Sequence, residues 1–516
     1  MSEVVDQSLQ KIVKGTGIIF TGTIIGMLLG FVGRVLFARF FTQAEYGIFS
    51  LALGVLSIAV TFSLLGLQGG CARQIAYYRG KNDSSKVQET LISSIQIALI
   101  TSIFVSAILF FSSDIISEKI FQEPKLSIPL RIFSMALPFF ALIHVFSSIF
   151  QGFDEVRPKV YFESILRNGL FLLLLALIIL LDLSFSLAMY AFSTSLIVTC
   201  IIFAIYTIKK IPIRIKIKLA INPIGRELLF FSLPLLAVTM LTGIILWTDT
   251  LMLGYFKTSD VVGLYNAAYP LGRLIVVLFS SMAFIYVPIA SGLYSRNLME
   301  EMKRIHAVLT KWVFIATSLL FLLFFLFPET ALNLLFGPQY IQADRALQIL
   351  ALGCFINISL GPNTYALLVI GRTKLLMWLT LIGTIMNIML NALLIPPMGI
   401  TGAAIASAFA TALINITALV AVYRLSGIHP FARNYLKLLG IFAVLLSLFY
   451  ALTFYLRLES WMIAILFIAL IFAYLLLLLL AKGFDEEDIS LLLALEGRAG
   501  INLIAIKRFI NRFLLK

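Results

Sequence analysis

Residues 40–52 read FFTQAEYGIFSLA, and residues 256–268 read FKTSDVVGLYNAA. Six positions recur at an offset of 216 as identical or similar residues: Phe40, Thr42, Gly47, Ile48, Phe49 and Ala52 match Phe256, Thr258, Gly263, Leu264, Tyr265 and Ala268. Three further pairs share an offset of 215: DIISEKIF (114–121) with ETALNLLF (329–336), ALPFF (136–140) with ALGCF (351–355), and VRPK (156–159) with GRTK (371–374). The common offset indicates an internal repeat.

The composition indicates an all-α polytopic membrane protein. Of 516 residues, 61% are hydrophobic and 12% are charged, and the mean hydropathy is +1.04. A soluble chain would carry about 25% charged residues. The apolar residues form blocks of about 20, the length that crosses a bilayer as a helix. We expect fourteen transmembrane helices, at 17–39, 46–68, 89–112, 128–150, 159–181, 185–208, 227–254, 262–292, 307–328, 347–370, 375–396, 399–423, 436–456 and 460–481.

The basic residues predict the orientation of these helices. If the N-terminus is cytoplasmic, 28 of the 39 Lys and Arg lie in cytoplasmic segments and 7 lie in outer loops or outer helix ends. Positive residues favour the cytoplasmic side. We therefore expect a multi-pass protein of the plasma membrane with both termini in the cytoplasm. The same bias accounts for most of the net charge of +14 without a nucleic-acid partner.

The repeat places six helices in each half. Because six is even, the halves enter the membrane from the same side and are related by a pseudo-two-fold axis along its normal, with a substrate site between them near the midplane. The expected organisation is a cytoplasmic segment (1–16), an N-lobe with helices 1–6 (17–210), a basic cytoplasmic linker (211–226), a C-lobe with helices 7–12 (227–424), helices 13–14 (433–481) and a cytoplasmic amphipathic tail (482–516).

Charged residues at membrane depth are the candidate functional groups, because a charge there costs free energy unless it is paired or faces a cavity. Asp249 matches Arg34 at the repeat offset of 215, so the two are expected on equivalent faces. Asp249 is then a coupling group or a counter-charge facing a central cavity. The alternative is that it pairs locally or hydrogen-bonds to Thr248 or Thr250. Asn266 and Arg273 fall on one helical face and are expected to line the cavity. The alternative for Arg273 is a structural ion pair with Asp249.

Several further residues are secondary candidates. Glu163 and Arg167 are four residues apart, so they can pair along one helix, as a functional or a purely structural pair. A lone His144 is expected to be a satisfied interior residue. The remaining candidates are Arg39, which could instead reach the outer surface, Asn387 and Asn391 as helix contacts or cavity residues, and Gly361 and Pro362 as a hinge.

The deep charges are mainly basic, which suits an anionic substrate. Arginine binds phosphate well because its planar fork donates two parallel hydrogen bonds. No P-loop, zinc-protease or dinucleotide motif is present. We therefore predict no catalytic residues, no metal and no cofactor, and leave H⁺ or Na⁺ coupling open.

Three stretches carry a family resemblance. The stretches are GRVLFARFFTQAEYGIFSLA (33–52) with LGLQGGCARQIAYYRGK (65–81), WTDTLMLGYFKTSDVVGLYNAAYPL (247–271) and LNALLIPPMGITGAAIASAFA (390–410). They resemble the polysaccharide and lipid-linked oligosaccharide flippases of the multidrug/oligosaccharidyl-lipid/polysaccharide (MOP) exporter superfamily. The resemblance covers residues 15–425. It implies two lobes that alternate access to a central cavity, a polyprenyl-phosphate-linked sugar as cargo, and Arg34, Arg273 and Asp249 as cavity residues.

Two other classes remain open. A cation-coupled multidrug extruder of the same superfamily would favour a cavity rich in carboxylates. A membrane enzyme such as a glycan polymerase would need catalytic residues on larger outer loops. For the flippase, the expected partners are a lipid-linked glycan, membrane lipids and glycan-assembly enzymes, and the chain is expected to be a monomer.

Overall fold

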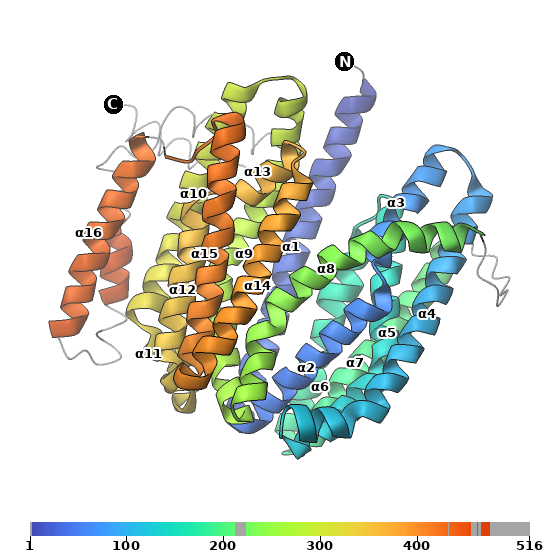
Figure 1. Cartoon of the computed structure of the whole chain (residues 1–516), viewed down its shortest axis with the longest axis horizontal. Coiled ribbons are helices and arrows are strands. Elements are labelled where there is room, and N and C mark those ends of the chain that lie inside the picture. Colours follow the sequence, from blue (N-terminus) through green and yellow to red (C-terminus); the bar gives the residue numbers. More distant parts are fainter. Residues whose placement is uncertain (1–2, 212–222, 432, 456–461, 463–465, 475–516) are drawn as a thin grey trace. The chain divides into compact units, whose positions relative to one another are not determined.

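The computed structural model describes residues 3–211, 223–431, 433–455, 462 and 466–474 (Figure 1). Within these ranges it describes the side chains from Thr21 onward except at 278, 280–285, 433–434 and 453–455. Within these residues every regular element is a helix and no strand is present. The predicted all-α class is therefore confirmed. Most of the predicted linker at 211–226, most of the fourteenth predicted helix and the amphipathic tail at 482–516 lie outside the described residues.

The helices agree in position with the predicted spans. Eleven helical segments of the described chain are long and apolar enough to cross a membrane, or twelve when the bent pair at 338–359 and 363–369 counts as one span. The bounds are α1 Glu3–Phe40, α2 Gln43–Leu64, α3 Leu67–Gly80, α4 Ser84–Asp114, η1 Ile115–Ile120, η2 Pro124–Leu126, α5 Ser127–Gly152, η3 Lys159–Leu166, α6 Arg167–Leu180, α7 Phe185–Lys210, α8 Pro223–Phe256, α9 Ser259–Ser295, α10 Met299–Leu326, α11 Pro328–Leu335, η4 Pro338–Ala343, α12 Asp344–Ser359, α13 Asn363–Val369, α14 Thr373–Met398, α15 Ile400–Ser426 and α16 Arg433–Tyr455.

The chain divides into two compact units. The N unit contains residues 18–267 and 390–400, and the C unit contains residues 268–389 and 401–516 together with 1–17. Their bounds differ from those of the predicted lobes, because α8 and the beginning of α9 belong to the N unit. The count of fourteen helices and the two six-helix lobes stay predictions.

The N unit is built around α5, which packs against α2, α3, α4, α7 and η3. Its side chains are largely buried, as those of Phe133, Leu137 and Ile149 show. Helix α8 packs along α2, α3 and α4. It contains Pro234, and Figure 1 shows it bent. A proline removes one backbone hydrogen bond and commonly bends a helix.

The second predicted span is longer than expected. The chain turns at Leu65 (φ 47°) and Gly66 (φ 76°), and the helix then resumes as α3 as far as Gly80. The helix thus continues twelve residues beyond the predicted end of the span at residue 68. Gly66 is suited to this turn because glycine adopts a positive φ without steric cost.

Two glycines that match in the repeat lie in contact within the N unit. Gly47 is in the first turns of α2, which begins with a capping box between Thr42 and Glu45. A Cβ atom added to Gly47 would lie 1.8 Å from the carbonyl oxygen of Ser259 and 3.0 Å from the amide nitrogen of Gly263. Small residues allow helix backbones to approach this closely.

The fifth predicted span begins as a π-helix. Residues Lys159–Leu166 form η3, and the chain continues as α6 from Arg167. Helix α1 packs on this segment through its glycines: added Cβ atoms on Gly22 and Gly26 would lie 2.0 Å from Val160 and 2.5 Å from Ser164. Short π-helical segments occur frequently at functional sites.

The C unit packs α10 against α11, α12 and α16. One of its cores joins α9, α10, α13 and α15 through Tyr286, Met302, Leu309, Leu367 and Val422. The tenth predicted span is broken: α12 and α13 are bent by 40°. Gly361 (φ 84°) and Pro362 lie in the break.

Candidate functional site

Asp249 is a buried hydrogen-bonded carboxylate of the N unit, and only 1% of it is exposed. The Tyr265 hydroxyl donates to its Oδ2 atom at 2.6 Å, and Nδ2 of Asn391 donates to its Oδ1 atom at 2.8 Å. The three residues come from α8, α9 and α14. Hydrogen bonds to an ionised group are stronger than neutral ones and make its burial tolerable.

The two threonines beside Asp249 have other acceptors. The Thr248 hydroxyl donates to the carbonyl oxygen of Ile244 at 2.6 Å. Thr250 lies 3.4 Å from Oδ1 of Asn266 across the α8–α9 hairpin. Asn266 is itself 4% exposed. The structure therefore places Asn266 beside the Asp249 cluster.

Asn391 carries an unsatisfied oxygen next to this carboxylate. Its side chain is 0% exposed, and among the described residues its Oδ1 atom has no hydrogen-bond partner. A buried acceptor without a donor is costly. We define Asp249, Tyr265 and Asn391 as the Asp249 cluster. It combines a carboxylate with an amide oxygen that could accept a hydrogen bond or contact a cation.

Arg34 and Arg167 form a second site in the N unit. Both side chains are half-buried, and the two guanidinium groups lie within electrostatic range of each other. Asn168, which follows Arg167, donates through Nδ2 to the carbonyl oxygen of Gly26 at 2.8 Å and so ties α6 to α1. Arg167 is also within electrostatic range of the Glu163 carboxylate, so this group of side chains contains two cations and one carboxylate.

Glu163 does not form the expected ion pair with Arg167. Its Oε1 atom lies 3.4 Å from Nδ1 of His144, and its Oε2 atom accepts a hydrogen bond from Ser147 at 2.8 Å. No Glu163–Arg167 salt bridge is present in the described chain. The carboxylate of Glu163 instead contacts His144 and Ser147 of α5, which packs against η3.

Arg167 lies within electrostatic range of the Glu163 carboxylate, although the two form no salt bridge among the described residues. Its guanidinium makes two long hydrogen bonds, of 3.4 and 3.3 Å, to Oδ1 of Asn168, and it lies 5.4 Å from the Phe140 ring. Arg39, another candidate, lies in the last turn of α1 and is exposed.

A chain of contacts leads from the arginines toward the Asp249 cluster. Arg34 lies within electrostatic range of Tyr46. The Tyr46 hydroxyl donates to the carbonyl oxygen of Asn266 at 3.0 Å. Asn266 directly follows Tyr265, which holds Asp249. Tyr46 of α2 is therefore hydrogen-bonded to the beginning of α9 and lies within electrostatic range of Arg34.

The remaining predicted residues lie in the C unit. The Arg273 side chain is exposed and lies 6.0 Å from the ring of Tyr269, with Cys354 and Tyr365 in electrostatic range. Asn387 is 2% exposed on α14. The break at Gly361 and Pro362 lies next to the buried side chains of His306 and Thr310.

The sequence did not indicate Tyr265, Ser147 or Asn168 as site residues. It also did not identify Glu163 as the partner of His144. Tyr265 is one of the repeat-matched residues, so its position was known, but nothing in its pattern assigned its hydroxyl to Asp249. Ser147 and Asn168 act across helix contacts that the spacing of residues along one helix does not reveal.

The comparisons with known proteins agree with this architecture. The family model described as polysaccharide biosynthesis protein matches residues 12–294, and the MatE model matches residues 234–393. An uncharacterized membrane protein of Methanocaldococcus jannaschii, MJ1068, is 25% identical over 416 residues, which is 78% of this chain and 82% of that protein. The probable low-salt glycan biosynthesis flippase Agl15 of Haloferax volcanii is 27% identical over 172 residues, 32% of this chain and 35% of that protein.

Among solved structures, the lipid II flippase MurJ in an inward closed conformation aligns with a TM-score of 0.70 and 15% identity, over 92% of this chain and 100% of that chain. The two family models and the flippase relative, together with the fold, indicate a transporter of the MOP superfamily. The chain belongs to the polysaccharide biosynthesis protein family, whose model covers more than half of it. The family resemblance found in the sequence is confirmed.

Proposed function

We propose that the protein flips a polyprenyl-phosphate- or diphosphate-linked oligosaccharide from the cytoplasmic to the outer leaflet of the plasma membrane by alternating access. Family membership supports transport for glycan assembly, and the Haloferax volcanii relative is called a probable flippase. The observation that carries the choice of cargo is the Arg34–Arg167 pair. Glu163 offsets one of these two cations, and an anionic group bound beside the guanidinium groups would offset the other.

The phosphate group is held, in this proposal, by Arg34 and Arg167 from the N unit. Their guanidinium groups suit the tetrahedral, multiply charged oxygens of a phosphate or diphosphate. The half-buried position strengthens these contacts, because water screens them less than at the surface. Arg273 is kept as a predicted further phosphate contact, supported by its exposed guanidinium in a helix of the C unit.

Asp249 is the proposed coupling group. Its carboxylate is buried, and the unsatisfied Oδ1 atom of Asn391 beside it offers an oxygen that a Na⁺ ion or a protonated carboxyl could use. The contacts of Tyr46 with Arg34 and with Asn266 give a physical route between the coupling group and the arginines. Binding of cargo at the arginines and of a cation at Asp249 would then influence each other through Tyr46 and the beginning of α9.

We further propose that the protein works without enzymatic chemistry of its own, as a monomer with cytoplasmic termini. Glycan-assembly enzymes would supply and consume its cargo. The bias of Lys and Arg supports the orientation.

A cation-coupled drug extruder is the second candidate, favoured by the match of the MatE model to residues 234–393. Deleting the gene separates the two functions. Loss of surface glycan without a change in drug susceptibility supports the flippase, and the reverse result supports the extruder.

A complementation assay tests the cargo site. The wild-type chain is expressed in a host that lacks its own lipid-linked glycan exporter, and surface glycan is measured. We expect R34Q and R167Q to abolish export while K119Q, which changes an exposed lysine of η1, retains it. Equal membrane levels of all variants are checked by immunoblot. Full export by both arginine variants would overturn the proposed site.

A further inference from the structure

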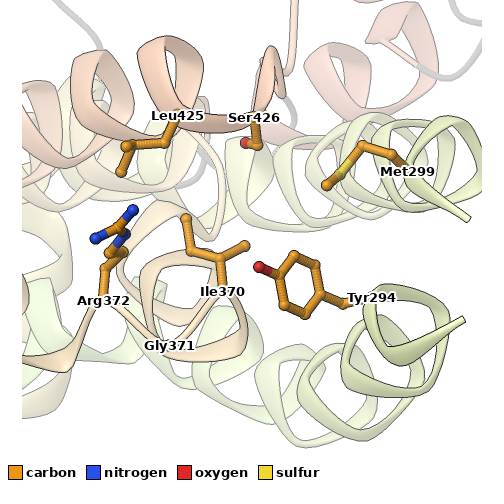
Figure 2. A pocket seen from close by; sticks show the side chains of 7 residues that line it. All are labelled: Tyr294, Met299, Ile370, Gly371, Arg372, Leu425 and Ser426. Atoms are coloured by element: carbon orange, nitrogen blue, oxygen red, sulfur yellow. The ribbon is translucent and has the colours of Figure 1, made fainter. Parts of the chain in front are cut away.

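The C unit contains a pocket of about 350 Å³ where several helix ends meet. Figure 2 shows its seven lining residues: Tyr294, Met299, Ile370, Gly371, Arg372, Leu425 and Ser426. They come from the end of α9, the start of α10, the turn between α13 and α14, and the end of α15. The volume lies within the range of about 300–1,000 Å³ that is usual for small-molecule sites.

The pocket offers one cation and one free hydroxyl. Arg372 has no carboxylate within salt-bridge distance among the described residues. The Tyr294 hydroxyl is directed toward the middle of the lining, on the other side of Ile370 from Arg372 (Figure 2). The Ser426 hydroxyl donates to the carbonyl oxygen of Val422 at 2.7 Å, so it is already used. The donors left for a ligand are therefore the guanidinium and the phenol.

The charge around the pocket is positive. Basic side chains lie within a few residues of the lining, while Glu300, one of the two nearby carboxylates, already pairs with Lys303 at 2.8 Å. The basic residues are Arg296, Lys303, Arg304, Lys374 and Arg424, and the carboxylates are Glu300 and Glu301. The distribution of Lys and Arg along the chain assigns this end of the helices to the cytoplasmic side, where the leaflet is anionic.

The rest of the lining is apolar. Met299 and Ile370 pack on the core of the C unit, which fixes that side of the pocket. Leu425 is 46% exposed, and the neighbouring surface carries Leu368 at 44% and Tyr423 at 56%. A fully hydrated free phosphate gains nothing from such a surface. A lipid gains from both parts, since its phosphate meets Arg372 while its glycerol and first methylene groups cover the apolar side.

We propose that this pocket binds the phosphate headgroup of an acidic lipid of the cytoplasmic leaflet. Arg372 binds the phosphate as a charge-assisted donor, and Tyr294 donates a second hydrogen bond. The headgroup bridges the end of α9, the α13–α14 turn and the end of α15, so it stabilises the folded C unit through its binding free energy. The site uses none of the residues proposed to hold the cargo, and it does not depend on the cargo's identity.

Thermal unfolding of the purified full-length chain in detergent tests this site, with dioctanoyl phosphatidic acid as the probe. We expect the Tm of the wild type to rise saturably with the lipid. In R372Q the apparent Kd should increase at least about tenfold, which is the effect of removing a charge-assisted hydrogen bond. Y294F should weaken binding by a smaller factor. K374Q, which removes a nearby cation that does not line the pocket, should increase the apparent Kd much less than R372Q does.

Three results would overturn the proposal. An unchanged response of R372Q would show that the pocket is not the binding site. An equal rise with dioctanoyl phosphatidylcholine would show a nonspecific effect of the chains. An equal rise with inorganic phosphate at the same concentration would assign the pocket to a free anion instead of a lipid.

Discussion

Gly47 and Gly263 make reciprocal contacts in the N unit. A Cβ atom on Gly47 would lie 1.8 Å from the carbonyl oxygen of Ser259, four residues before Gly263, and one on Gly263 would lie 2.2 Å from that of Gln43, four residues before Gly47. The two glycines match in the repeat, so each repeat contacts the other with the same surface. Such a self-complementary contact is what a two-fold axis generates.

Replacing Gly47 with alanine should therefore destabilise the protein. The new methyl group cannot be accommodated without moving backbone, and overpacking typically costs about 1–3 kcal/mol. The Tm of the detergent-solubilised protein measures the effect. G440A is the matched control, because a Cβ atom at this α16 position would meet nothing within 4 Å. A G47A protein as stable as the wild type would mean that the two backbones are not in contact.

Tyr265→Phe tests the support of the buried carboxylate. Without the hydroxyl, Oδ2 of Asp249 loses its 2.6 Å hydrogen bond inside the N unit, and we expect a loss of about 1–3 kcal/mol in unfolding free energy. Transport should also change its dependence on pH or Na⁺, since the coupling group has a new environment. Y190F serves as the control, because Tyr190 is 53% exposed. Identical stability and ion dependence of Y265F and the wild type would remove Tyr265 from the site.

Arg167→Lys distinguishes a phosphate-binding fork from a simple positive charge. Lysine keeps the charge but cannot donate two parallel hydrogen bonds from a plane. We expect export to fall roughly tenfold, less than in R167Q, since about one charge-assisted hydrogen bond is lost. Quantified surface glycan in the complemented host is the readout. If R167K exported as well as the wild type, charge alone would be sufficient at this position.

Gly361→Ala tests the break between α12 and α13. Gly361 has a φ of 84°, and an added Cβ atom would lie 2.6 Å from Oγ1 of Thr310 and 3.1 Å from Nε2 of His306. Gly371 has a similar φ of 76° but open space around it, so G371A measures the backbone strain alone. The strain is about 1–2 kcal/mol. We expect G361A to lower the Tm more than G371A does. Equal shifts would show that the contact with α10 is not tight.

Much of the fold could be predicted from hydropathy and from the repeat. The spans follow from the length of apolar blocks, and the Gly361–Pro362 break follows from two residues that interrupt a helix. The extension of the second span to Gly80 could not be predicted in this way. Polar residues such as Gln74 and Arg79 are not typical of a membrane-spanning helix, and the burial of Gln74 in the N unit is not evident from the sequence.

The candidate site was predicted less completely, because its contacts cross between helices. The position of Asp249 was evident from its charge, but its donors Tyr265 and Asn391 come from α9 and α14. Spacing along one helix also gave the wrong partner for Glu163. The contacts of Glu163 with His144 and Ser147 cross from η3 to α5, and the spacing of residues in KVYFESIL does not indicate that neighbour.

The central claim is that the arginine pair binds the phosphate of a lipid-linked glycan that the protein moves across the membrane. Reconstitution of the purified chain into liposomes with a fluorescent polyprenyl-diphosphate oligosaccharide tests it most directly. The readout is the fraction of the fluorescent lipid that an impermeant quencher can reach over time.

We expect the wild type to exchange the lipid between leaflets, and R34Q and R167Q to exchange it no faster than protein-free liposomes. K119Q should behave as the wild type. Exchange by R34Q and R167Q at the wild-type rate, or no exchange by the wild type under any ion gradient, would contradict the claim.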